Sequence, residues 1–444
     1  MSQKKSGKQG HEVRIKSLIH SIAGTTKIIP EGIFVEVGSK ALVVKARPAK
    51  REQCRCGICH KRASGYDCGR ETRRWRCLNV GAEMTYIESS LPRVRCKEHG
   101  VVSAAVPWAR HKSRFCKNFE ETVAWLSTHA SKKTVSELMR IEWHTVGNIC
   151  KRVYKGLEQA AANRFDGLVN IGIDETSYKK GHKYMTVVIN HDTAAVVWCG
   201  IGYGKEVLSG FFELLTPEQR ASIRCVSADG ARWIASCIDK YCPNAERCVD
   251  PFHVVTWATE TLDKERRHAW SEAYQTAKEA KKRGKGHPAK GESVNPEKKQ
   301  AKAVKNLRYV LLKNPENLSE NQQAQLEFLT QANPRLYRAY LLKEGLRLAL
   351  KVGADEIEYA LNKWMGWAQR CRIPGFRELR LKIKRNFVAI VASAKHGLSN
   401  ARMEATNNKI KLGIRTAFGF RNPDSLIAMV MLTCSDIQPK LPRL

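Results

Sequence analysis

The most constraining feature of this chain is an ordered series of strand and helix patterns between residues 168 and 262. Three β-rich runs, LVNIGIDE, KYMTVVIN and AAVVWCGIG, are separated by turn-length gaps. Helices and strands then alternate: a helix over 207–215, a strand over 222–230, a helix from Ala231, a strand over 245–250 and a helix from about Phe252. This βββαβαβα order predicts an α/β fold, a mixed sheet with helices on its faces.

Two aspartates lie where strands of this sheet are predicted to end. Asp174 closes the first strand and Asp229 closes the fourth, and the predicted topology makes these two strands neighbours. Because side chains alternate along a strand, Glu175 is expected to point away from the face of Asp174. The sequence therefore predicts two carboxylates close together at one edge of the sheet.

A third acid, Glu404, lies in a strongly basic part of the chain. Residues 371 to 421 contain twelve Lys or Arg and only two acids. The pattern around Glu404 predicts a helix with Ser399 or Asn400 as its cap. Its buried stripe is predicted to comprise Met403, Ile410 and Ile414, and its polar side Glu404, Asn407, Asn408 and Lys411.

Three carboxylates gathered at one place require a counter-charge. At about 5 Å, with an effective dielectric constant near 20, each pair repels by roughly 3 kcal/mol. Two Mg²⁺ ions would relieve this repulsion, because hard cations take oxygen ligands. Such a metal pair can activate a water or a 3′-hydroxyl and stabilise the leaving oxygen in phosphodiester chemistry. Asp174, Asp229 and Glu404 are therefore the candidate catalytic and Mg²⁺-binding residues.

The charge of the chain points to a polyanionic partner. The 444 residues include 77 Lys or Arg and 43 Asp or Glu, which gives a formal net charge of +34. Nucleic acid is the expected partner, because no apolar run approaches the length of a membrane span. The opening MSQKKSGKQGHEVRIK is too polar for a signal peptide, so we expect a cytoplasmic protein without a membrane partner.

Seven of the fifteen cysteines lie between Cys54 and Cys116, and this local crowding favours metal binding over disulfides. The knuckles Cys56-x-x-Cys59 and Cys96-x-x-His99 are separated by thirty-six residues with strand-like alternation. Four such ligands predict a structural Zn²⁺ site of the ribbon type. Three other cysteines remain as rival ligands: Cys54, Cys68 and Cys77.

The segment SKKTVSELMRIEWHTVGNICKRVY, residues 131 to 154, has the pattern of a helix-turn-helix. Thr134 is the predicted cap of the first helix, and a break follows at residues 140 to 142. The second helix would present its first turns to base edges in the DNA major groove. The candidate base-contacting residues are Trp143, His144, Thr145 and Asn148.

Long stretches of this sequence resemble bacterial insertion-sequence transposases of the DDE type, in the IS-L-three group. The matching strings are VPWARHKSRFCKNFE, VSELMRIEWHTVG, GIDETSYKKGHKYMTVV, VSADGARW, VDPFHVV and HGLSNARMEATNNKIKLGIRTAFGFRN. The resemblance implies an RNase H-like core with Asp174, Asp229 and Glu404 as its catalytic set. It also implies a supporting role for the Asp250-x-x-His253 signature. His99 stands where the family usually has a second cysteine, so the fourth zinc ligand departs from the family pattern.

The resemblance completes the predicted domain organisation. The five parts are a basic tail with a β-hairpin (1–50), a zinc ribbon (51–118), a helix-turn-helix (119–165), an RNase H-like core (166–261 and 371–435) and a helical insertion (262–370). The insertion includes residues 278–313, which hold twelve basic residues against three acids. DNA-backbone contacts are also expected from Arg402, Lys409, Lys411 and Arg415.

The function expected from this resemblance is that of a DNA transposase. It would bind the terminal inverted repeats of its element, cut there and join 3′ ends to target DNA, as at least a homodimer associated with the bacterial nucleoid. Two alternatives remain open at the level of sequence. One is a DNA-binding regulator with the same ribbon and helix-turn-helix over an inactive core, and the other is a structure-selective nuclease without strand transfer.

Overall fold

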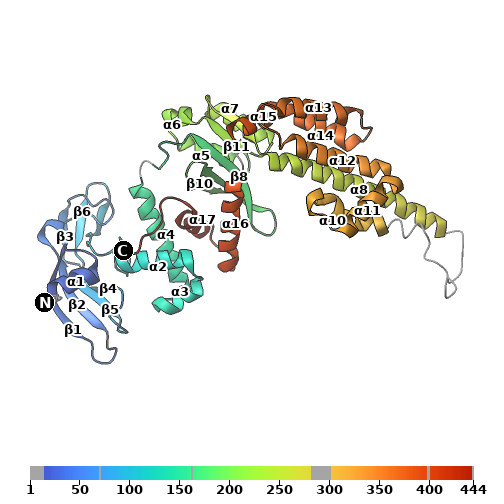
Figure 1. Ribbon diagram of the computed structural model, residues 1–444. Coiled ribbons are helices and arrows are strands. Elements are labelled where there is room, and N and C mark those ends of the chain that lie inside the picture. Colours follow the sequence, from blue (N-terminus) through green and yellow to red (C-terminus); the bar gives the residue numbers. More distant parts are fainter. Residues whose placement is uncertain (1–14, 70–71, 162–163, 282–301, 398–400, 443–444) are drawn as a thin grey trace, which may run out of the picture. The chain divides into compact units, whose positions relative to one another are not determined.

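A computed structural model describes residues 15–69, 72–161, 164–281, 302–397 and 401–442 (Figure 1). The chain divides into two compact units, one formed by residues 1–162 and 412–444 and the other by residues 163–411. The division falls within the helix α16, Ala401–Thr416. None of the helices in the described ranges has both the length and the apolar character needed to cross a bilayer.

The 163–411 unit contains the predicted mixed sheet, a five-stranded sheet in the order β10-β9-β8-β11-β12. Its strands are β8 (Asn170–Lys179), β9 (Lys183–Asn190), β10 (Val196–Ile201), β11 (Cys225–Ala228) and β12 (Glu246–Val249). The first three form an antiparallel meander, and β11 lies parallel to both β8 and β12. The predicted meander and the predicted neighbourhood of the first and fourth strands are confirmed.

Strand β8 is longer than predicted. It runs past Asp174 to Lys179, because its hairpin with β9 continues as far as the pairing of Lys179 with Lys183. The prediction that Asp174 ends this strand is therefore wrong. The parallel pairing with β11 nevertheless stops at Gly172, so Asp174 lies just beyond the end of the parallel ladder.

Short helices cover the sheet and complete its core. They are α5 (Lys205–Glu213), α6 (Pro217–Ser222) and α7 (Arg232–Tyr241). The sequence analysis missed α6, whose capping box joins Thr216 and Gln219. Apolar side chains from α5 and α7, including Phe211, Phe212 and Ile238, pack with β8 and β11 residues in one buried cluster.

A helical layer follows β12 in the chain. It comprises α8 (Pro251–Lys281), α10 (Arg308–Leu312), α11 (Glu320–Ala332), α12 (Pro334–Ala349), α13 (Ile357–Arg370), α14 (Pro374–Arg385) and α15 (Phe387–His396). The predicted insertion boundary at residue 262 lies inside α8, which starts directly after the sheet. A single buried cluster connects Val249 of β12 with Leu262, Leu346, Trp364 and Phe376, so the helices and the edge of the sheet share a core.

The other unit begins with two small sheets. One has the order β1-β2-β5-β4 and the other the order β3-β6-β7. Their elements are α1 (Ile15–Ala23), β1 (Ile28–Val35), β2 (Leu42–Pro48), β3 (Ser64–Asp67), β4 (Thr72–Arg76), β5 (Thr85–Ser90), β6 (Arg93–Cys96) and β7 (Gly100–Ser103).

The predicted hairpin around Gly38 is present as β1 and β2, and β2 pairs with β5. This pairing places parts of the predicted 1–50 and 51–118 segments in one sheet. Helix α1, which the sequence analysis treated as part of a basic tail, packs Ile19 with the edge-to-face pair Trp75 and Trp108.

Cys77 and Cys116 form a disulfide in this core, with a Cα–Cα distance of 5.2 Å. The expectation that the crowded cysteines would avoid disulfides is therefore wrong for this pair. The structure places both sulfurs inside the apolar cluster that contains Trp75, away from the predicted zinc ligands, so Cys77 is not a rival ligand.

Four helices complete this unit: α2 (Lys117–His129), α3 (Lys132–Met139), α4 (Trp143–Ala160) and α17 (Pro423–Cys434). Leu432 of α17 lies in the same buried cluster as Phe119, Val146 and Val153. Residues 412–435 close the 371–435 segment that is predicted as part of the RNase H-like core, and in this structure they lie in the compact unit that contains the helix-turn-helix. Packing of a distant segment on an apolar face is not visible in the local periodicity of that segment.

A buried carboxylate stabilises this helical cluster. Glu120 on α2 has no exposed surface and accepts bonds from Arg110 at 3.1 Å, Arg152 at 2.7 Å and the Ser113 hydroxyl at 2.7 Å. Removal of one partner from a buried ion pair leaves the remaining charges without compensation. Glu120 is therefore a structural residue that connects α2 with α4 and with the loop before α2.

The substitution Glu120→Ala should destabilise α2 and α4 by roughly 3–5 kcal/mol, because two partly buried arginines lose their shared partner. Hydrogen exchange of the α2 and α4 amides in the full chain measures this free energy of opening. Glu121→Ala is the matched control, since Glu121 is partly exposed and accepts only from Arg110; it should cost under about 1 kcal/mol. Equal effects of the two substitutions would contradict the assignment.

Candidate functional site

Two predicted acids lie at the same edge of the sheet in the 163–411 unit. Asp229 directly follows β11, and Asp174 lies two residues past the last β8 residue paired with β11. Both side chains are partly buried. We call Asp174, Glu175 and Asp229 the acid edge.

The electrostatics of the acid edge show that negative charge is concentrated there. Burial raises the pKa of Asp174, and the nearby Asp229 carboxylate raises it further. Burial also raises the pKa of Glu175, and the charges of Asp229 and Asp174 add to this rise. The Glu175 carboxylate itself accepts from the backbone N–H of Gly204 at 3.4 Å. Partly buried carboxylates with raised pKa values form a site that favours a cation.

Asp174 is held by defined hydrogen bonds. Its Oδ1 accepts from the backbone N–H of Glu175 at 2.8 Å, and its Oδ2 accepts from Asn407 Nδ2 at 2.6 Å. The Asn407 bond connects β8 to α16, a helix 233 residues away in the chain. Asn407 was predicted on the polar side of its helix, but it is buried. The polar acceptor on β8 explains why an amide, and not an apolar residue, occupies this buried position.

Helix α16 has a second attachment to the sheet. The Arg402 guanidinium donates to the backbone carbonyl of His191, and the His191 ring is within 2.6 Å of the Ser227 hydroxyl on β11. Arg402, a predicted DNA contact, thus has a partner within its own unit. Lys409, Lys411 and Arg415 are exposed and remain available to a ligand.

Glu404 lies on the exposed surface of α16, about one helical turn before Asn407. Asp174, Asp229 and Glu404 do not form a three-ligand group in this structure. Within the described residues, the one group of three or more side chains that could hold a metal ion is Cys56, Cys59, Cys96 and His99, whose ligand atoms all lie within 4.8 Å of one another. The structure brings the two aspartates together and attaches the helix of the third acid to them, while the Glu404 carboxylate stays in solvent. Residues 399 and 400, the predicted caps of this helix, lie outside the described residues.

The Asp250-x-x-His253 signature begins α8 beside the acid edge. Asp250 is buried, and its carboxylate accepts from the backbone N–H of Phe252 at 3.1 Å, which caps the helix. The charge of His253 lowers the pKa of Asp174. His253 therefore lies near the acid edge, and Asp250 fixes the start of the helix that carries it.

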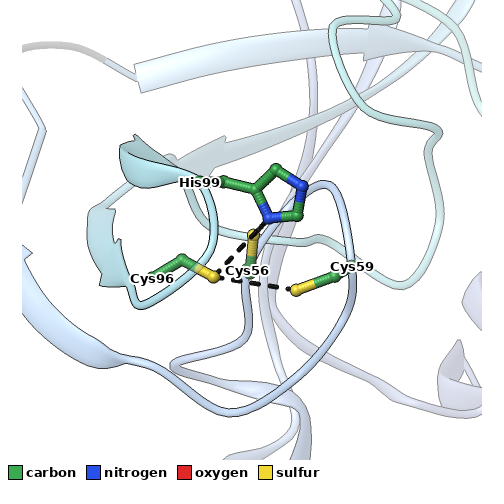
Figure 2. A group of neighbouring side chains, drawn as sticks. All are labelled: Cys56, Cys59, Cys96 and His99. Carbon is green, nitrogen blue, oxygen red and sulfur yellow. Dashed lines mark hydrogen bonds between the residues drawn. The ribbon is translucent and has the colours of Figure 1, made fainter.

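The predicted zinc ligands converge in the other unit (Figure 2). Cys56 and Cys59 lie in the turn before β3, while Cys96 and His99 lie at the turn between β6 and β7. The Cys59–Cys96 sulfur distance is 3.7 Å, and the His99 Nδ1 atom lies 3.6 Å from Cys96 Sγ and 3.8 Å from Cys56 Sγ. A tetrahedron with Zn–S bonds of about 2.3 Å and a Zn–N bond of about 2.0 Å has edges of about 3.8 and 3.5 Å. The four ligand atoms therefore fit Zn²⁺.

The remaining rival ligands lie outside this cluster. Cys54 and Cys68 are exposed free thiols. Within the cluster, the hydrogen bond from His99 lowers the pKa of Cys96 to about 6. A thiol that ionises this readily suits a metal, because the thiolate is the form that binds. His99 thus occupies the fourth ligand position through its Nδ1 atom.

The helix-turn-helix is formed by α3 and α4, with a left-handed Arg140 in the turn (φ 51°). Its cap is Ser131, whose hydroxyl accepts from the backbone N–H of Thr134; the assignment of Thr134 itself as the cap is wrong. Trp143, His144 and Asn148 are exposed at the start of α4, and Thr145 is half-buried.

Trp143 is less free than the sequence indicates. The Lys132 ammonium lies 4.8 Å from the centroid of its ring and 5.0 Å from that of Phe420. These cation–π contacts fix the first turn of α4. Burial lowers the pKa of Lys132, as expected for an ammonium between two rings.

Comparison with known proteins gives the same order of parts. Residues 52–99 match a family described as the zinc-finger of transposases, and residues 104–154 match the helix-turn-helix domain of transposase family ISL3. Residues 171–430 match the DDE transposase domain of the same ISL3 family. The chain belongs to the ISL3 family of insertion-sequence transposases. The ribbon, the helix-turn-helix and the RNase H-like fold class expected from the sequence are confirmed at this level.

Two relatives show how far this similarity extends. The transposase for insertion sequence element IS1557 of Mycobacterium tuberculosis is 48% identical over 401 residues, 90% of each chain. The transposase for insertion sequence element IS1001 of Bordetella parapertussis is 26% identical over 379 residues, 84% of this chain and 86% of its own. The similarity therefore extends over most of the chain, and the matched families include the ribbon, the helix-turn-helix and the unit with the acid edge. As a transposase with a helix-turn-helix domain, this ISL3 protein binds DNA.

The zinc cluster makes a testable prediction. Full-length protein should carry about one zinc per chain, and Cys96→Ser should remove it, because a hydroxyl is a poor substitute for a thiolate at a tetrahedral zinc site. Metal analysis of the purified protein measures this ratio. Cys68→Ser is the control, since Cys68 is an exposed free thiol outside the cluster, and it should retain the metal. Zinc loss in the control, or full zinc in Cys96→Ser, would contradict the assignment.

The Asn407 bond makes a second prediction. Asn407→Ala should detach α16 from Asp174 and speed hydrogen exchange of the 401–411 amides by about tenfold, as expected for one lost hydrogen bond to a charged group. Asn408→Ala is the control, because Asn408 is the next residue in the helix and its side chain is exposed. If the two variants exchange at the same rate, the Asn407 bond does not hold this helix.

Proposed function

We propose that this ISL3 transposase binds the terminal inverted repeats of its element, cleaves the element ends and joins the 3′ ends to target DNA. The observation that carries the proposal is the pairing of Asp174 and Asp229 at one sheet edge, in an environment that raises the pKa of Asp174. A chain with a net charge of +34 supplies the attraction for the DNA polyanion.

Asp174, Asp229 and Glu404 are the residues proposed to hold two Mg²⁺ ions. When bound, the ions would activate the attacking oxygen and stabilise the leaving one. The donor set fits a hard cation because it consists of oxygen ligands. One further observation supports the fit: Asn407 Oδ1 is buried beside Asp174 and has no partner within the described residues. This acceptor suits a cation or one of its waters.

The other site residues have proposed roles that follow from their positions. His253 balances charge beside Asp174, and Asp250 positions His253 through the cap of α8. Asn407 and Arg402 hold α16 against the sheet, and Glu404 is proposed to turn from the exposed surface of this helix toward the acid edge when the metal ions bind. Positioning of this kind supplies much of the catalysis in phosphoryl transfer.

The DNA contacts are proposed from exposure and charge. The ribbon and the start of α4, with Trp143, His144, Thr145 and Asn148, would read the terminal repeats. Lys409, Lys411 and Arg415 would contact backbone phosphates, and Arg402 would do so only by leaving His191. Two element ends must meet in one complex, so the active form is proposed to be at least a dimer, in the bacterial cytoplasm.

The test incubates the purified full chain with labelled element ends, a target plasmid and Mg²⁺, and measures cleavage and joined products. Asp174→Asn, Asp229→Asn and Glu404→Gln should each lower both reactions at least about 1,000-fold, because each removes a metal ligand. Glu378→Gln is the control, since Glu378 is the other acid in the 371–421 segment and is exposed on α14.

Each outcome assigns the function. Binding without cleavage by the unsubstituted chain would favour a DNA-binding regulator. Cleavage without joining would favour a nuclease. Full activity in Glu404→Gln, with loss in both aspartate variants, would remove Glu404 from the metal site and leave the two aspartates.

A further inference from the structure

A basic pocket of about 580 Å³ lies in the 163–411 unit, outside the residues discussed so far. Four cationic side chains and one acid line it, together with a buried amide. These residues are Arg232, Arg247, Lys382, Arg385, Asp239 and Asn386. Four positive charges against one negative charge leave an excess that attracts an anion.

The fold holds the inner side of this pocket rigidly. Arg247 on β12 donates to the Asn386 side-chain oxygen at 2.8 Å, and Asn386 donates to the Lys382 carbonyl at 2.9 Å. The Lys382 ammonium lies 3.7 Å from the centroid of the Trp257 ring. Strand β12 and the helices α8 and α14 therefore fix two cations before any ligand arrives.

The positive charge of the pocket is poorly neutralised. Within the described residues, none of the four cations makes an ion pair of 4.0 Å or less. Burial is the largest influence on Arg247 and Lys382 and lowers both pKa values. The charges of Asp239 on Arg247, of Glu260 on Lys382 and of Asp229 on both raise these pKa values without overcoming the effect of burial. Arg232 and Arg385 are exposed, so they can turn toward a ligand.

The basic pocket adjoins the acid edge. Gly230, which directly follows Asp229, lines the pocket, and the charge of Asp229 acts on both Arg247 and Lys382. A Cβ atom at Gly230 would lie 2.5 Å from the Trp257 ring, so only glycine allows this close approach between the acid edge and the ring that supports Lys382. A strand of DNA at the acid edge would have neighbouring phosphates within reach of the pocket.

We propose that the basic pocket binds one backbone phosphate of the DNA strand that enters the acid edge, next to the phosphate that reacts. Arginine guanidinium groups match phosphate oxygens in a two-bond geometry, and a contact of this kind fixes the register of a strand. The pocket thereby determines which phosphodiester reaches Asp174 and Asp229. This inference rests on the proposed function, because it assumes that DNA is the substrate of the acid edge.

The first experiment measures binding of the full chain to a duplex of the element end, without added divalent metal, over a range of salt concentrations. Arg385→Gln should lower the slope of log K against log salt by about 1, as expected for one lost phosphate contact. Lys384→Gln is the matched control, because Lys384 is the exposed neighbour on α14 and does not line the pocket. Its slope should equal that of the unsubstituted chain.

The second experiment replaces single phosphates of the same duplex with uncharged methylphosphonates. At one position near the cleavage site, the replacement should weaken binding by the unsubstituted chain about tenfold, the size expected for a charge-assisted contact. In Arg385→Gln, the methylphosphonate at that one position should not weaken binding further, whereas replacements elsewhere should act as in the unsubstituted chain. This is the coupling expected of a direct contact. If circular dichroism shows that Arg385→Gln does not fold, Arg232→Gln is used in its place.

The outcomes separate this inference from the proposed function. No binding of the element end by the unsubstituted chain would count against the proposed function itself. Normal binding with no coupled phosphate position, or with equal effects of Arg385→Gln and Lys384→Gln, would overturn the pocket assignment alone. A third result would also overturn the pocket assignment. If no phosphate position is coupled to Arg385, and inorganic phosphate protects the pocket arginines from a guanidine-modifying reagent, then the pocket binds a free anion.

Discussion

The unfavourable proximity of two partly buried aspartates is the constraint on which the rest of the catalytic unit depends. The parallel pairing of β8 with β11 brings Asp174 and Asp229 to one edge, and burial together with their mutual repulsion raises the pKa of Asp174. The surrounding residues reduce this cost: Asn407 and the Glu175 N–H donate to Asp174, and the charge of His253 acts on it. These partners balance only part of the negative charge of the two aspartates. The remaining charge favours a cation at this edge.

Helix α16 shows how a residue far away in the sequence reaches that edge. Its attachment uses two polar contacts, from Arg402 to His191 and from Asn407 to Asp174. Glu404 lies between these contacts in sequence, on the solvent side of the helix. These contacts attach to the sheet the helix that carries Glu404, one of the two acids in a segment with twelve basic residues. The basic pocket adds a second feature of the same edge, because Gly230 lines it and the charge of Asp229 raises the pKa values of Arg247 and Lys382.

Local patterns in the sequence were sufficient for most of the fold. Alternation and turn residues predicted the meander and the adjacency of β8 and β11, and the spacing of Cys56, Cys59, Cys96 and His99 predicted the metal cluster. The errors have different origins. Strand β8 continues past Asp174 because its hairpin with β9 extends to the pairing of Lys179 with Lys183. The disulfide between Cys77 and Cys116 joins residues 39 positions apart, a pairing that local periodicity does not reveal. Asn407 was misplaced on the polar side of its helix because its partner, Asp174, lies 233 residues away in the chain.

The central claim is that Asp174, Asp229 and Glu404 together bind the catalytic metals. The most direct measurement is a structure of the full chain on its element ends with Mn²⁺ in place of Mg²⁺, in which anomalous scattering locates the metals. We predict two metal peaks held by Asp174 and Asp229, with a Glu404 oxygen as a ligand to at least one of them. A Glu404 side chain that remains in solvent, with both metals bound only by other residues, would contradict it.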